Sequence, residues 1–280
     1  MTRTGRRRAF AADWPTDPAQ FARSIVPLGL LALAAIVPIA RLPVLLVLIG
    51  GTAVAIARDA PVRWAWAGTV PIAVSLMWGA LPAPVAAADG SDCADPTSPV
   101  AMWRVGEAAL VLGSLGVLAR VLGAPPSSLS LHWPRRDVVR LSVLGFVIVG
   151  PLALVVGPIL ARPFFGSIDY DTLNLGALLP ALLFAIANGS MEELAYRGAL
   201  QGWSARVVGV WPAVLGQAVV FGLAHSGADV LANGLVLMVA LGAGGFIAGA
   251  ITVRTRSVLF PLAIHIGLDI PIYYAFACAR

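Results

Sequence analysis

Nine long apolar segments constrain the fold of this chain more than any other feature of its sequence. They lie at roughly 24–40, 43–57, 64–84, 101–123, 141–161, 174–203, 210–226, 230–252 and 257–277. About 20 helical residues cross a hydrocarbon core about 30 Å thick, and a helix satisfies its own backbone hydrogen bonds there. The alternating pattern of a β-barrel is absent. The sequence therefore predicts an all-α, polytopic transmembrane helical bundle with about eight or nine spans.

The composition supports this class and excludes a soluble domain. Hydrophobic residues make up 59% of the 280 residues and charged residues only 12%, which leaves too little polar surface to cover a water-soluble fold. The first two apolar segments are short, so they could form one hairpin hinged at Arg41-Leu42-Pro43. We divide the chain into a basic arm (1–22), N-terminal spans (23–173) and a C-terminal core (174–280).

The distribution of arginine predicts the topology. All nineteen basic residues are arginines, a bias typical of a GC-rich genome, and we expect a prokaryotic cell membrane. With the N-terminus in the cytoplasm, the predicted inner loops contain Arg58, Arg63, Arg135, Arg136, Arg140, Arg206, Arg254 and Arg256. Because these arginines are spread among short loops, the net charge of +5 indicates membrane orientation and no nucleic-acid partner. Cys93 and Cys278 both fall on the outer side, where a disulfide could persist, but two cysteines alone leave their pairing open.

Ionisable residues in the apolar segments are few, and most lie in the C-terminal part. Only three glutamates occur in the chain, and two of them are adjacent in the sixth segment, Glu192 and Glu193. A charged side chain inside a membrane is costly and usually has a function. Glu193 and Arg197 are four residues apart and can form an ion pair, whereas Glu192 lies on another face of the helix, shared with Asn188. In the fourth segment, the spacing of Arg104 and Glu107 is typical of a structural ion pair.

Two further polar pairs follow at helical spacing. Phe221 precedes His225 by one turn in the seventh segment, and His265 precedes Asp269 by one turn in the last segment. A single histidine near a helix end is usually a packed or interfacial residue. Two of the three histidines and two of the three glutamates, however, lie on late segments that can pack together. Their joint occurrence predicts a site, which we expect in a polar cavity in the inner half of the membrane.

The residue types in this set favour hydrolysis by activated water. Glu192 is suited to take a proton from water, and histidines can stabilise an oxyanion or bind a metal. No Gly-x-Ser-x-Gly, Ser-Lys or Cys-His arrangement offers a nucleophile, and His-Glu-x-x-His is also absent. Direct attack by water is therefore favoured over a covalent intermediate. For this chemistry we expect Glu192 and His225 to lie within about 12 Å of each other.

The three motifs, in this order, resemble those of the CPBP intramembrane endopeptidases, also called the Abi or type II CAAX prenyl endopeptidase family. The resemblance covers residues 174–273 and reads Glu192-Glu193 to Arg197, Phe221 to His225, and His265 to Asp269. It implies that Glu192 activates water with help from His225, and that His265 and residue 269 stabilise the oxyanion. Glu193, Arg197 and Phe221 would then be supporting residues.

The resemblance leaves the cofactor open. The family has been described both as metal-independent glutamic proteases and as metalloproteases, so the chain would need either no cofactor or one divalent metal such as zinc. The possible metal ligands are Glu192, His225, His265 and Asp269. Asp269 stands where the family commonly has asparagine, and we expect it to orient His265.

The expected partners are the lipid bilayer and a membrane-anchored or lipidated peptide or protein substrate. Two other functions stay open: a non-proteolytic immunity or scaffold protein, and a proton-coupled transporter, although no internal repeat supports a transporter. The glycines of the eighth segment, Gly242, Gly244, Gly245 and Gly249, favour close helix packing over a lateral gate for substrate.

Overall fold

The computed structural model describes residues 18–83, 91–132, 134–165, 174–225 and 234–278. Within these ranges the chain is helical, and its only β feature is an isolated bridge between Leu131 and Ser257. Most of the predicted basic arm and Asp229, a possible partner of His225, lie outside the described residues. The first helix begins at Pro18, inside the predicted arm.

The described helices follow the predicted apolar segments in order. They are α1 (Pro18–Ile36), α2 (Arg41–Ala57), α3 (Arg63–Trp78), α4 (Pro99–Val121), α5 (Arg136–Phe165), α6 (Leu178–Glu192), the π-helix η7 (Glu193–Gln201), α7 (Gly202–Val208), α8 (Val210–Ala224), α9 (Leu235–Thr255) and α10 (Leu259–Ala277). Short 3-10 turns are η3 (Pro38–Ala40), η4 (Ser91–Ala94), η5 (Pro126–Leu129) and η6 (Leu175–Ala177). The predicted all-α class is confirmed.

Seven helices of the described chain are long and apolar enough to cross a membrane. α3 and α8 have only 16 and 15 residues, which is short for a full crossing. The longest continuous helical stretch is Leu175–Val208, with 34 residues. At 1.5 Å per residue it is roughly 50 Å long, well beyond the thickness of the hydrocarbon core. The protein is therefore an integral membrane protein whose central helix is longer than the hydrocarbon core is thick.

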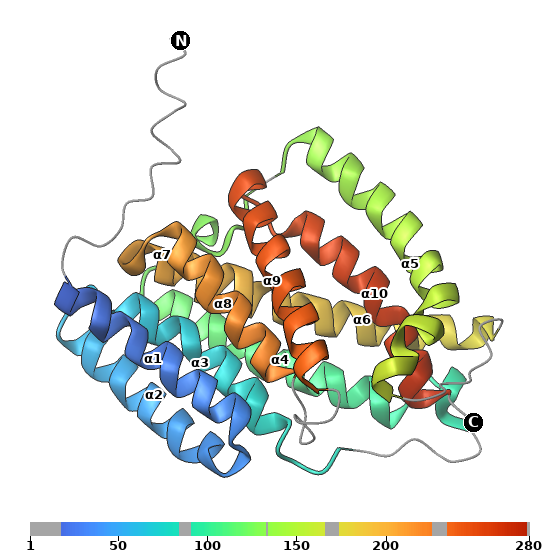
Figure 1. The fold of residues 1–280 in the computed structure, drawn as a ribbon, viewed down its shortest axis with the longest axis horizontal. Helices are drawn as coiled ribbons and strands as arrows, with labels where there is room; N and C mark the ends of the chain where they lie inside the picture. Colours follow the sequence, from blue (N-terminus) through green and yellow to red (C-terminus); the bar gives the residue numbers. More distant parts are fainter. Residues whose placement is uncertain (1–17, 84–90, 133, 166–173, 226–233, 279–280) are drawn as a thin grey trace, which may run out of the picture.

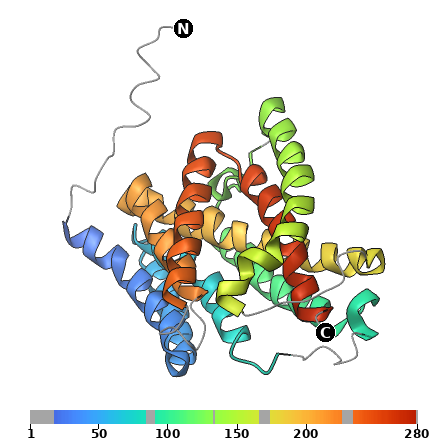
Figure 2. The same cartoon turned by 45° about the vertical axis from the view of Figure 1, so that its right-hand side comes forward.

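The arrangement of the helices places this long stretch in the middle of the molecule. Figure 1 shows α1, α2 and α3 together at one end and α5 and α10 at the other, with α6 running between them. Turning the view shows the same order, with α5 beside α10 (Figure 2). α3 is buried along most of its length and packs against η7 through Gly68, where a Cβ would contact the backbone of Ala199 and Leu200. The N-terminal helices thus cover one side of the segment that contains Glu192 and Glu193.

The first two helices form a hairpin, as predicted, but the turn lies slightly earlier. α1 ends at Ile36, η3 makes the turn, and α2 already begins at Arg41. Pro43 lies in the first turn of α2. The backbone N–H groups of a first turn have no acceptor within the helix, so a proline, which lacks this N–H, is tolerated there. The predicted hinge residues therefore start the second helix.

Glycines bring α8 and α9 into close contact. A Cβ on Gly222 of α8 would collide with the carbonyl oxygen of Met238, and Gly242 lies opposite. A Cβ on Gly249 would lie within 3 Å of the side chains of Gln201 and Gln217. Close packing, the favoured interpretation of these glycines, is confirmed at Gly242, Gly245 and Gly249, whereas Gly244 has open space beside it.

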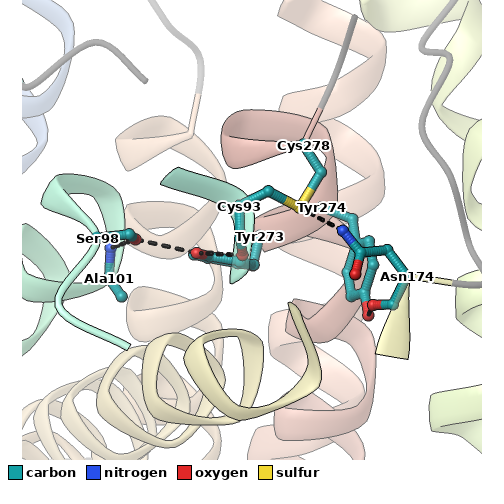
Figure 3. The surroundings of a disulfide bond; sticks show 7 residues. All are labelled: Cys93, Ser98, Ala101, Asn174, Tyr273, Tyr274 and Cys278. Atoms are coloured by element: carbon teal, nitrogen blue, oxygen red, sulfur yellow. Dashed lines mark hydrogen bonds between the residues drawn. A yellow bond between two sulfur atoms is a disulfide. The ribbon is translucent and has the colours of Figure 1, made fainter. Parts of the chain in front are cut away.

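A disulfide joins Cys93 to Cys278 and ties the end of α10 to η4 (Figure 3). The sequence left this pairing open; the two Cα atoms are 4.9 Å apart. The Tyr273 hydroxyl donates a hydrogen bond to the Cys93 carbonyl at 3.1 Å, and the Tyr274 hydroxyl donates to the Asn174 carbonyl at 2.9 Å. These contacts anchor the last helix, which contains His265 and Asp269, to two loops of the chain.

Candidate active site

The two adjacent glutamates lie where the long central helix changes its hydrogen-bonding pattern. α6 ends at Glu192, and the π-helix η7 begins at Glu193. π-Helical turns are rare and frequently occur at functional sites, because the extra residue in the turn redirects neighbouring side chains. The Glu193 side chain is 2% exposed and that of Glu192 is 12% exposed. Both carboxylates are therefore held inside the bundle and need partners there.

Glu193 is shared between an arginine and a histidine. Its Oε1 lies 3.0 Å from Nη1 of Arg197 and 2.9 Å from Nδ1 of His265. The Arg197 side chain is only 2% exposed, so this is a fully buried ion pair. Since a carboxylate oxygen only accepts, the hydrogen bond requires a proton on Nδ1 of His265. Glu193 thus links the central helix to α10 and fixes the orientation of the His265 ring.

Phe221 of α8 supports both Arg197 and His225. The Arg197 guanidinium lies 4.3 Å from the centre of the Phe221 ring, a cation–π contact in a buried setting. The imidazole of His225 lies 4.5 Å from the same ring centre, and its Nδ1 is 2.7 Å from the Phe221 carbonyl oxygen. Because a carbonyl can only accept, Nδ1 of His225 is the protonated nitrogen. In the neutral ring, Nε2 then presents a lone pair.

Glu192 faces both imidazoles without a direct hydrogen bond to either. Its Oε2 lies 3.9 Å from Nε2 of His225 and 3.6 Å from Nε2 of His265. The same oxygen is buried and has no hydrogen-bond partner among the described residues. The predicted proximity of Glu192 and His225 is confirmed. Two acceptors, the carboxylate and Nε2 of His225, therefore face each other at a separation that one water can bridge.

Asp269 closes the site on the side of α10. Its Oδ2 lies 3.7 Å from Nε2 of His265, which is longer than a hydrogen bond, and it accepts a hydrogen bond of 2.9 Å from Nδ2 of Asn188. We expected Asp269 to orient His265. In the structure, Glu193 makes the hydrogen bond that does so, and Asp269 is itself held by Asn188.

The structure brings all seven predicted site residues into one cluster from α6, η7, α8 and α10. The central helix crosses the bundle next to α8 and α10, so side chains from these separate helices meet. Two features were not predicted from the sequence: the hydrogen bond between His265 and Glu193, and the hydrogen bond from Asn188 to Asp269. The position of Asn188, one turn before Glu192 in an apolar segment, is the sequence feature that could have indicated its role.

A second, partly buried ion pair lies on α4. Nη1 of Arg104 is 2.6 Å from Oε2 of Glu107, which confirms the predicted pair, and the Ser75 hydroxyl donates to Oε1 of Glu107 at 2.6 Å. The Arg104 guanidinium also lies 5.3 Å from the centre of the Phe184 ring on α6. These contacts attach α3 and α4 to the helix that contains the candidate site.

The donors of the cluster do not form a metal site. Nowhere in the described ranges are three His, Cys, Asp or Glu side chains arranged to hold a metal ion. His225 and His265 each have Nδ1 bound to another group, which leaves Nε2 as the nitrogen on the side of Glu192. We derive no step through a metal.

Apolar helices enclose a buried carboxylate and two imidazoles, which are residue types that water-activating hydrolases use. A family model described as Rce1-like, type II CAAX prenyl endopeptidase, matches residues 174–270. The match includes all three motifs and confirms the resemblance to the CPBP family over this segment. Residues 174–270, about a third of the chain, are thus similar to a CAAX-protease-like intramembrane endopeptidase. Comparison with curated proteins and with solved structures gives no match.

Proposed function

We propose that the protein cleaves a peptide bond of a membrane-anchored or lipidated substrate with a water molecule activated by Glu192. The observation that supports this most directly is the buried Oε2 of Glu192, which has no hydrogen-bond partner among the described residues and faces Nε2 of His225 at 3.9 Å. A water placed there donates one O–H to the carboxylate and the other to the imidazole. Its lone pairs then point away from both acceptors, towards a substrate carbonyl.

The reaction proceeds by direct addition. The water oxygen bonds to the carbonyl carbon while one water proton moves to Glu192, and the carbonyl oxygen becomes an oxyanion. When the carbon–nitrogen bond breaks, Glu192 returns this proton to the leaving amine. His225 holds the water through Nε2 because the Phe221 carbonyl keeps the proton on Nδ1.

His265 stabilises the oxyanion in this scheme. Its Nδ1–H is bound to Glu193, so the ring donates from Nε2, on the side of Glu192, when both of its nitrogens are protonated. Asp269 lies 3.7 Å from the same Nε2 and supports the positive ring electrostatically. A donor that is already oriented stabilises developing negative charge without reorganisation. Glu193, Arg197 and Asn188 are positioning residues in this scheme.

The substrate is expected to reach the site from the bilayer. Helices around the cluster expose many large apolar side chains on their outer faces, including Val155 and Ile159 of α5 and Val236 and Val239 of α9. A lipid anchor on the substrate would partition into the same hydrocarbon region and raise the local concentration of the peptide near the site. The family match agrees with a prenylated peptide as the first substrate to test.

The test uses purified protein in lipid nanodiscs and a fluorogenic peptide with a farnesylated cysteine. Wild type is compared with Glu192→Ala, His225→Ala and the exposed control Asp59→Asn, and products are mapped by mass spectrometry. We expect cleavage by wild type and the control, and loss in both site variants by a factor of about 100 or more. Equal cleavage by all four proteins would refute the proposal. No cleavage by any protein, with any of a library of lipidated peptides, would favour the immunity, scaffold or transporter alternatives.

A further inference from the structure

A polar cavity lies apart from the candidate active site. It has a volume of about 180 Å³, and none of Glu192, His225, His265 or Asp269 lines it. Its polar lining comes from three separate parts of the chain: Ser127, Ser130 and His132, Gln201, and Thr252 and Arg256. The cavity is thus formed by the loop after α4, the end of η7 and the end of α9.

The walls of this cavity are held by contacts between these segments. Leu131 and Ser257 form the isolated β-bridge, and the N–H of Val258 donates to the Ser130 carbonyl at 3.3 Å. The indole N–H of Trp203 donates to the Ser128 hydroxyl at 3.1 Å. These bonds attach the loop both to the turn after α9 and to α7. The cavity is therefore a built feature of the fold.

The polar groups of the lining are suited to an anion. No carboxylate lines the cavity, and the Arg256 guanidinium forms no ion pair with any described residue. The serine hydroxyls and the guanidinium are donors that match phosphate oxygens. Gln201 also lines the cavity; it is 4% exposed, and its Nε2 donates to the Gly249 carbonyl at 3.1 Å.

The position of the cavity agrees with a membrane headgroup. Its lining includes the end of the candidate span Leu235–Thr255, and the candidate span beginning at Arg136 starts just after His132. Headgroups lie at the level where spans end. Arg135, Arg136 and Arg254 add positive charge near these helix ends, and Asp137 is the acidic partner of Arg135. Basic cavities between helix ends are suited to attract anionic lipids.

We propose that this cavity binds the phosphate group of an anionic phospholipid such as phosphatidylglycerol. Arg256, Ser127 and Ser130 bind the phosphate. Gln201 is the last residue of η7, so the bound lipid contacts the same helical segment that contains Glu193 and Arg197. The proposal is independent of the proteolytic function, because it concerns a separate set of side chains.

The experiment measures lipid binding to the purified full-length protein by native mass spectrometry and by thermal unfolding. Phosphatidylglycerol is titrated into nanodiscs of phosphatidylcholine, and inorganic phosphate is titrated separately in detergent. Wild type is compared with Arg256→Gln, with Arg256→Lys, and with Arg254→Gln as a matched control on the same helix end. Arg254 does not line the cavity. Melting in phosphatidylcholine alone checks that each variant is folded.

We expect phosphatidylglycerol to bind to wild type and to Arg254→Gln, with affinity lowered about tenfold or more by Arg256→Gln and less by Arg256→Lys. Protection by inorganic phosphate at an equal concentration, lost in Arg256→Gln, would identify a free phosphate as the ligand of the same site. Equal binding by wild type and Arg256→Gln would overturn the proposal. An equal loss in Arg254→Gln and Arg256→Gln would also overturn it, because it would show only a general charge effect.

Discussion

The buried ion pair between Glu193 and Arg197 offers the sharpest test of the site's architecture. Replacing Glu193 by glutamine keeps the shape of the side chain but removes its charge, and leaves Arg197 buried without a counter-charge at 2% exposure. Breaking one partner of a buried pair costs about 3–5 kcal/mol. For a protein of this size, that free energy corresponds to a fall in melting temperature of roughly 10 °C.

The chain contains a matched control for this variant. Asp59 and Arg63 form an ion pair with the same spacing of four residues, but the Asp59 side chain is 89% exposed. An exposed pair contributes about 1 kcal/mol or less, so Asp59→Asn should change the melting temperature little. Asp59 has a φ of 48°, which asparagine tolerates well. The two variants thus separate the effect of burial from that of spacing.

Stability and catalysis can then be separated with a double variant. Combining Glu193→Gln with Arg197→Met removes both charges, and a buried pair replaced by uncharged residues is often neutral for stability. We expect the melting temperature to recover, whereas cleavage stays about tenfold below wild type. The remaining loss reflects the weaker hydrogen bond from His265 to a neutral acceptor. Thermal unfolding in nanodiscs and single-turnover cleavage measure the two quantities. If Glu193→Gln melted like Asp59→Asn, the reasoning from burial would be refuted.

Three other outcomes follow from particular contacts. Asn188→Leu removes the donor to Asp269 and should lower kcat by about tenfold with little change in KM; an unchanged kcat in steady-state assays would show that this bond has no part in cleavage. Reduction of the Cys93–Cys278 disulfide, or Cys93→Ser with Cys278→Ser, should lower thermal stability by about 2–4 kcal/mol, and a variant that melts like wild type would contradict this. Dialysis against a chelator should leave cleavage unchanged, because the proposed mechanism has no step through a metal, whereas loss of activity restored by zinc would refute the metal-free mechanism.

The helical class and the site residues could be predicted because both depend on local sequence patterns. Apolar length predicts a spanning helix, and a spacing of four residues places Glu193 beside Arg197 and His225 beside Phe221. The match at residues 174–270 begins where the predicted C-terminal core begins, and the division of the chain at this point stays a prediction. The cytoplasmic location of the N-terminus also stays a prediction.

The features that sequence patterns did not predict depend on contacts between helices. The bond between Glu193 and His265 joins residues 72 positions apart, and it exists because the central helix crosses the bundle beside α10. The expected partner of His265, Asp269, came from the motif on the last segment, and spacing within one helix does not predict a contact from another helix. α3 and α8 are shorter than a regular span. Their place in the bundle depends on packing against neighbouring helices, which apolar length does not predict.

The single-turnover cleavage rate of Glu192→Gln, compared with wild type on the same lipidated peptide, tests the central claim most directly. Glutamine keeps the shape of the side chain and can still bind a water, but it cannot take the proton. A glutamate base predicts that the rate falls by a factor of about 100 to 10,000 while the peptide still binds. A rate within about threefold of wild type would contradict the proposed role of Glu192.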